Sequence, residues 1–113
     1  MHELSLIHAL LETIREQAAA DHFSRVHRVA LEVGALCCVE IAALEFCFEV
    51  ASAGTSAAGA ALEITEVPAE GRCEGCRKSF SVSSPLCQCP FCGAWDLAIS
   101  GGDRIAIREL EVE

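Results

Sequence analysis

The chain has 113 residues, of which 52% are hydrophobic and only 5% aromatic, which predicts one modest domain with an aliphatic core. Its formal net charge of −9 and its scattered lysines and arginines exclude nucleic acid as the expected partner. His2 and Glu3 stand where a signal peptide has basic residues, and glutamates interrupt the longest apolar stretch, so we expect neither a leader nor a membrane span. Eight cysteines without an export signal are typical of a soluble cytoplasmic protein whose cysteines bind metal.

The first 34 residues predict a helix followed by a strand. Apolar residues recur at spacings of three and four, which predicts an amphipathic helix that ends before Asp21. Residues 25–34 alternate between apolar and polar, which predicts a half-buried strand ended by Gly34. The apolar stripe of the helix consists of Leu4, Ile7, Leu11, Ile14 and Ala18.

A second helix and a second strand follow in the same order. Residues 39–53 predict a helix that buries Ile41, Leu44, Phe48 and Ala51, and its glutamates face water. Residues 61–67 alternate again and predict a strand. The first 68 residues therefore contain a helix–strand–helix–strand sequence.

The last part of the chain divides into a cysteine-rich segment and a third strand. The composition changes at residue 69, and residues 73–92, which hold five of the eight cysteines, are too poor in aliphatic side chains to fold by burial alone. Residues 104–112 predict a strand. Because a third strand makes such a sheet much more stable, we expect an α+β fold in which two helices pack on a three-stranded sheet. The expected domains are residues 1–68 plus 103–113, with residues 69–102 inserted before the last strand as a four-cysteine, zinc-ribbon-like module.

The inserted segment contains two CxxC pairs, Cys73/Cys76 and Cys89/Cys92, separated by twelve residues. Each CxxC turn brings two sulfurs to one side of a tight knuckle, and two facing knuckles supply a tetrahedral thiolate site. A structural zinc site is the leading interpretation, because four sulfurs leave no open position for a substrate. A rubredoxin-like iron site and a redox dithiol are the alternatives. Cys87 is an alternative ligand, although a CxC turn fits a knuckle less well.

The first three residues, Met1, His2 and Glu3, suggest a different metal site. The α-amine and the His2 peptide nitrogen close one chelate ring, and the same nitrogen and the His2 imidazole close another. With the peptide nitrogen of Glu3 these donors form a plane, which suits Ni(II) or Cu(II) better than zinc. The Glu3 carboxylate could add an axial ligand or accept a hydrogen bond from the imidazole. A histidine at position 2 is, by itself, weak evidence, and a plain exposed residue is the alternative.

Four segments, MHELSLIHALLETI, VALEVGAL, LEFCFEVASAGTSAAGAALEITEVPA and CEGC…CPFCG, occur in this order along the chain. Together they resemble the HypA/HybF family of hydrogenase-maturation nickel metallochaperones. The resemblance implies a non-enzymatic carrier with Ni(II) at Met1, His2 and Glu3 and structural Zn(II) at the four CxxC cysteines. It also implies docking to a HypB-type GTPase and delivery of nickel to the large-subunit precursor of a [NiFe]-hydrogenase. A homodimer and a role in urease maturation stay open.

Two functions of other classes compete with this one. A rubredoxin-like electron carrier would contain iron, and a zinc-ribbon adaptor for protein partners would have no nickel affinity. The chain also departs from the family pattern at Cys37, Cys38, Cys47 and Cys87. Cys47 is expected to behave as a small buried hydrophobe. The role of the neighbouring residues Cys37 and Cys38 stays open.

Overall fold

The computed structural model describes residues 2–113, so the predicted ligand Met1 lies outside the described residues. The chain forms two compact units. The helical unit comprises residues 2–31, 39–65 and 106–113, and the cysteine unit comprises residues 32–38 and 66–105. None of the helices in the described part of the chain is long and apolar enough to cross a membrane.

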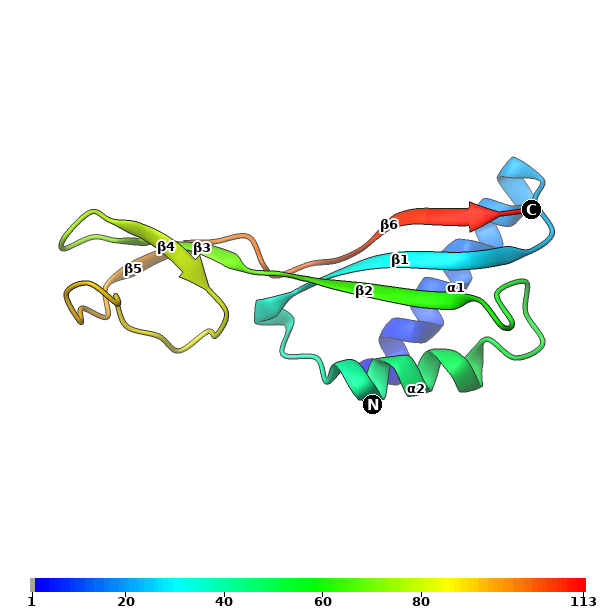
Figure 1. Cartoon of the computed structure of the whole chain (residues 1–113), viewed down its shortest axis with the longest axis horizontal. Coiled ribbons are helices and arrows are strands. Elements are labelled where there is room, and N and C mark those ends of the chain that lie inside the picture. Colours follow the sequence, from blue (N-terminus) through cyan, green and yellow to red (C-terminus); the bar gives the residue numbers. More distant parts are fainter. Residues whose placement is uncertain (1) are drawn as a thin grey trace. The chain divides into compact units, whose positions relative to one another are not determined.

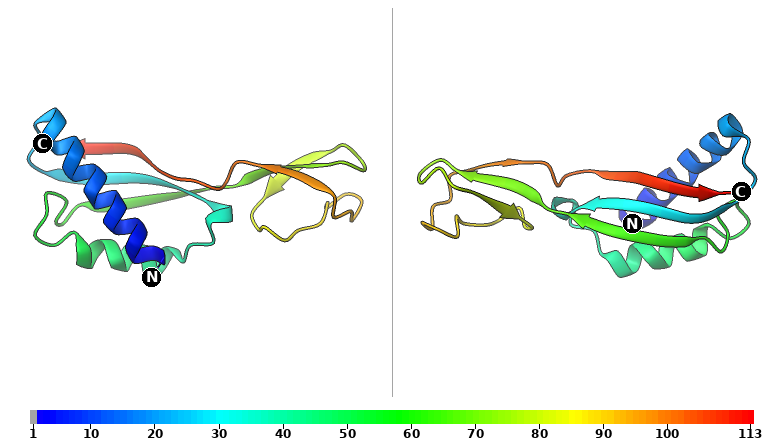
Figure 2. Two further views of the ribbon diagram at one scale, coloured as in Figure 1. Left: turned by 180° about the vertical axis from the view of Figure 1, so that it is seen from behind. Right: turned by 45° about the horizontal axis from the view of Figure 1, so that its top comes forward.

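The helical unit is a three-stranded sheet with two helices on one face (Figures 1 and 2). The strand order is β2-β1-β6, so β1 is the central strand. Both helices and the three strands predicted for this part of the chain are therefore confirmed. Their bounds are α1 His2–Asp21, β1 Val26–Gly34, α2 Ile41–Ala51, β2 Ala61–Val67 and β6 Ile105–Val112.

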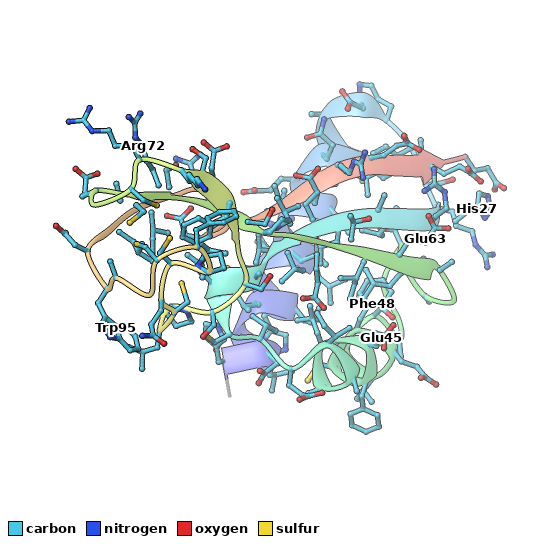
Figure 3. The ribbon with its side chains drawn as sticks, turned by 60° about the vertical axis from the view of Figure 1, so that its left-hand side comes forward. His27, Glu45, Phe48, Glu63, Arg72 and Trp95 are labelled. Atoms are coloured by element: carbon cyan, nitrogen blue, oxygen red, sulfur yellow. The ribbon has the colours of Figure 1, made fainter. Side chains whose placement is uncertain are left out.

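The core of the helical unit lies between the sheet and the helices. Val29 and Leu31 of β1 are buried, as the alternation predicted, and Leu44 and Phe48 of α2 are buried as well. Figure 3 shows Phe48 on the side of α2 that faces the sheet. The remaining buried apolar residues of this unit are Ile7, Leu10, Ile14, Val26 and Ala57.

The predicted stripe of α1 is partly wrong. Leu10 is buried, whereas Leu4 is 41% exposed and Leu11 is only half-buried. Spacings of three and four both continue an apolar stripe, so Leu10 and Leu11 were equally compatible with the pattern. The packing of α1 on the sheet and on α2 determines which one is buried.

The cysteine unit contains a second sheet that the sequence pattern did not reveal. The order is β4-β3-β5, and both pairings are antiparallel. These strands are short and carry polar and charged residues on their exposed face, so their apolar alternation is weak. Their bounds are β3 Ala69–Cys73, β4 Ser79–Val82 and β5 Leu97–Ser100. The α+β class with a separate four-cysteine unit is confirmed, and it has three strands more than predicted.

A close approach of backbones explains why glycine ends β1. A Cβ atom on Gly34 would lie 2.2 Å from the carbonyl oxygen of Gly102. The Gly34 amide donates to Arg104 O at 2.7 Å, and the Leu36 amide donates to Gly102 O at 2.7 Å. Because Gly34 has no side chain, it allows two backbone segments of the cysteine unit to lie in direct contact, in addition to ending a strand.

Candidate metal centres

Four cysteine sulfurs of the cysteine unit converge on one point. The Sγ atoms of Cys73, Cys76, Cys89 and Cys92 all lie within 4.8 Å of one another. The Cys73–Cys92 and Cys76–Cys89 sulfur pairs are 3.5 and 3.6 Å apart. Cys73 and Cys89 are buried, whereas Cys92 is exposed, so the cluster lies near the surface. Cys87 is not a member of this group.

The two CxxC turns have the same backbone geometry. In the first turn, the Arg77 amide donates to Cys73 O at 2.8 Å, and in the second the Gly93 amide donates to Cys89 O at 2.8 Å. Arg77 has φ 63° and Gly93 has φ 78°, so both turns end on a left-handed residue. Glycine adopts such a φ without steric cost. The first knuckle places an arginine at the equivalent position, which the sequence pattern did not indicate.

Further hydrogen bonds fix the two knuckles. The Cys73 amide donates to Lys78 O at 3.0 Å, and the Cys89 amide donates to Ala94 O at 2.8 Å. The Glu74 amide donates to Asp96 O at 3.0 Å and so connects the first knuckle to the segment before β5. The sulfurs are therefore held by backbone bonds close to the cluster.

Backbone amides also point at the sulfurs and change their acidity. The Cys76 amide, 3.4 Å from the Cys73 sulfur, holds the pKa of Cys73 below its ordinary value. Burial raises the pKa of Cys89, but the amides of Cys92 and Phe91 outweigh it and bring that pKa down to about 6. The Ala94 amide lowers the pKa of Cys92, but the neighbouring Cys73 sulfur and burial raise it to about 11.

This donor set fits a thiophilic divalent cation. Four negative sulfurs at these separations repel one another, and the high pKa of Cys92 expresses that repulsion. A divalent cation at the centre removes the repulsion and favours thiolate over thiol at every position. Zinc and iron both accept four thiolates in tetrahedral geometry, so the residues can hold either.

At the other candidate site, the structure describes His2 and Glu3 at the start of α1. The His2 side chain is exposed, and the first amides of a helix have no intrahelical acceptor. The Glu3 carboxylate accepts a hydrogen bond from the Glu40 amide at 3.1 Å. This bond is the largest of the interactions that lower the pKa of Glu3.

The bond between Glu3 and Glu40 is not predicted by any sequence pattern. Glu40 is the N-cap residue of α2, and its own side chain makes no capping hydrogen bond. The Glu3 carboxylate therefore connects the start of α1 to the start of α2, where the positive end of the helix dipole favours an anion. No local motif indicates it, because the two residues are 37 positions apart in the chain.

The other histidines and cysteines of the described chain form no further cluster. His27 has a structural contact, because its Nε2 lies 3.0 Å from Glu113 Oε1. Cys47 is half-buried on α2, and Cys38 adopts φ 55° at the end of a short 3₁₀ turn, Ala35–Cys37. Within residues 2–113, the four CxxC cysteines are the one group of three or more His, Cys, Asp or Glu side chains arranged to hold a metal ion.

The fold and the cluster define a small metal-binding protein with a helix-covered sheet and a four-thiolate knuckle unit. A family model described as "Hydrogenase/urease nickel incorporation, metallochaperone, hypA" matches residues 1–112. The chain belongs to the HypA family, and it is a non-enzymatic nickel metallochaperone of [NiFe]-hydrogenase maturation.

Relatives agree with this assignment, and a solved structure shares the fold. The hydrogenase maturation factors HypA of Azotobacter chroococcum and Acidithiobacillus ferrooxidans are 43% and 45% identical over 113 residues, which is the full length of both chains in each comparison. The solution structure of the nickel metallochaperone HypA from Helicobacter pylori has a TM-score of 0.68 and 22% sequence identity. The match covers 99% of this chain and 97% of the other. Because the sequence identity is only 22%, this match supports the fold alone.

Proposed function

We propose that this metallochaperone binds Ni(II) with Met1, His2 and Glu3, through the α-amine, the first peptide nitrogens and the His2 imidazole. The observation that carries the proposal is the start of α1 at His2, with an exposed imidazole and amides that have no helical partner. Deprotonating these amides costs no helical hydrogen bond. The Glu3 carboxylate is occupied by the Glu40 amide, so its role is to anchor the terminus beside α2.

Such a site is suited to transfer. Its ligands are terminal and exposed, so an acceptor can replace them one at a time without unfolding the protein. Binding displaces protons from the amine, the imidazole and the amides, and the nickel affinity therefore falls as the pH drops.

We further propose that Cys73, Cys76, Cys89 and Cys92 hold a structural Zn(II). The convergence of their sulfurs and the shortage of other core residues in this unit support that role. The proposed functional division is a nickel-binding domain of residues 1–68 plus 103–113 and a zinc-binding domain of residues 69–102. Residues 32–38, which are the end of β1 and the turn after it, belong to the compact cysteine unit, although they lie within the proposed nickel-binding domain in the sequence.

The proposed partners follow from hydrogenase maturation. We infer that a HypB-type GTPase docks to the chain and that the large-subunit precursor of a [NiFe]-hydrogenase receives the nickel. The compartment is the cytoplasm, where thiols stay reduced and available to metal.

The experiment is a metal titration of untagged protein and two histidine variants. His2→Ala should lose the high-affinity nickel, as should a form with a long N-terminal tag, and zinc content should stay unchanged in both. His22→Ala is the matched control, because His22 is also exposed and lies just after α1. If His2→Ala binds nickel as tightly as His22→Ala does, the terminal site is wrong. Elemental analysis of the same samples separates zinc from iron at the four cysteines.

A further inference from the structure

Helix α2 presents two large apolar side chains to solvent. Phe46 is 66% exposed and Val50 is 60% exposed. The two residues are four positions apart, so they are neighbours on one face of the helix. The opposite face carries Leu44 and Phe48, which are buried, so the exposed pair contributes nothing to the core.

The same helix carries an unfavourable arrangement of charge. Glu45 and Glu49 are exposed and four positions apart, and like charges at this spacing destabilise a helix. Glu49 also lies near the C-terminal end of α2, where the helix dipole disfavours an anion, and the last turn has no basic residue. A local cost of this kind, next to exposed apolar side chains, is expected where a surface serves a function.

The two carboxylates border a groove that can receive a side chain. A cavity of about 350 Å³ between α2 and the start of β2 is lined by Glu45, Glu49, Phe48 and Leu62 among others. Figure 3 shows Glu45 and Phe48 close together on α2. A lining that is part apolar and part polar, with two carboxylates among its residues, matches the alkyl stem and cationic head of a lysine or arginine.

This surface lies close to the proposed nickel terminus. The Glu3 carboxylate binds the Glu40 amide at the start of α2, and Phe46 follows six residues later. At 1.5 Å per residue the distance along the helix axis is about 9 Å. A protein docked on this face of α2 is therefore within reach of the first residues of α1.

We propose that Glu45, Phe46, Glu49 and Val50, the α2 face, form the docking surface for the protein that exchanges nickel with this chain. The partner must present an apolar pocket for Phe46 and Val50, rimmed by lysine or arginine for the two glutamates. A second copy of this chain, which is strongly acidic, and an anionic membrane are both repelled by the same charges. The identity of the exchange partner rests on the proposed function, whereas the docking surface is argued from α2 alone.

The test measures binding of the purified HypB-type GTPase and of the purified hydrogenase large-subunit precursor from the same organism. Phe46→Ala should raise the dissociation constant for one of these proteins by about tenfold or more, because a central aromatic anchor is lost. Leu86→Ala truncates a large apolar side chain of the cysteine unit that is even more exposed, at 81%, and this control should change nothing.

A variant that removes the two charges of the α2 face separates a binding role of the glutamates from a role in stability. The double variant Glu45→Gln/Glu49→Gln should bind the partner several-fold more weakly at low salt, and the difference should vanish at high salt. The same variant should unfold at a temperature about 1–3 °C higher, because the like-charge pair is removed. Weaker binding from a more stable protein identifies the glutamates as part of the interface.

Four results would overturn the proposal. They are unchanged affinity in both α2 variants, an equal loss in Leu86→Ala, no binding of either protein to the wild type, and a dimer in sedimentation that Phe46→Ala converts to monomer. Nickel binding is measured on the same samples and should be unaffected by every α2 variant. If the wild type binds no nickel while the α2 variants still lose the partner, the proposed nickel site fails and the docking surface stands.

Discussion

The two knuckles place different residues in the same strained conformation, and this allows a paired test of stability. Arg77 and Gly93 both have positive φ and both donate their amide to the first cysteine of their own turn. An L-residue in this conformation costs about 1–2 kcal/mol, and glycine avoids that cost but loses about 0.5–1 kcal/mol through its freer unfolded chain. The difference favours glycine by roughly 1 kcal/mol at either position.

Two substitutions of opposite direction follow from that difference. Gly93→Ala should destabilise the metal-loaded protein by about 1 kcal/mol. A Cβ on Gly93 meets nothing within 4 Å, so the backbone conformation is the whole cause. Arg77→Gly should stabilise the protein by a similar amount, about 1 kcal/mol. Each change corresponds to about 3–6 °C in melting temperature for a chain of this length.

The assay is thermal unfolding of the metal-loaded variants, together with the rate of metal release to a chelator. Arg72→Gly is the control, because Arg72 lies in β3 and is absent from the positive-φ residues. The same arginine-to-glycine change there should lower the melting temperature, since glycine weakens a strand. If Arg77→Gly and Arg72→Gly destabilise the protein equally, the left-handed conformation of Arg77 carries no cost, which refutes the reasoning.

Three other outcomes are expected. Gly34→Ala should destabilise the chain by about 2–3 kcal/mol in denaturant unfolding, because its Cβ would meet a backbone carbonyl at 2.2 Å, whereas Gly101→Ala, with open space around it, should cost only about 1 kcal/mol. Calorimetry of metal binding at pH 7.4, in buffers of different ionisation enthalpy, should detect the release of fewer than four protons from the four cysteines. The pKa of Cys89 is lowered to about 6, so this thiol has already lost its proton before the metal binds. Release of all four protons would refute that acidity. Glu3→Ala should lower the melting temperature at pH 7, because the bond to the Glu40 amide is lost. The difference from wild type should close as the pH falls below 4.5, the ordinary pKa of glutamate, and through the lower pKa of Glu3 in the folded protein, because protonation weakens the same bond. A difference that stays constant with pH would contradict this role.

The elements of the helical unit were predictable because each has a strong local signal. The strand at residues 61–67 was predicted with the bounds that the structure has, since it alternates cleanly between two turn-forming segments. The convergence of the four cysteines was also foreseen, because CxxC spacing determines local turn geometry whatever the rest of the fold does.

What the sequence did not reveal depends on distant partners. The strands β4 and β5 each hydrogen-bond to β3, and the sheet buries only one narrow face, so its residues carry little periodic signal. The choice of Leu10 over Leu11 is made by packing against other elements. The bond from Glu3 to the Glu40 amide joins residues that no pattern relates. Each of these features comes from tertiary contacts, which local propensity does not encode.

The single tryptophan has a practical consequence for studying the molecule. Trp95 is 65% exposed, and the chain has no tyrosine. Figure 3 labels Trp95 among the side chains of the cysteine unit. Both α-helices belong to the helical unit. Indole fluorescence therefore reports on the four-cysteine segment alone, and the helical circular dichroism band reports on the remainder. One sample in one cuvette can thus reveal whether the two halves melt together or in separate steps.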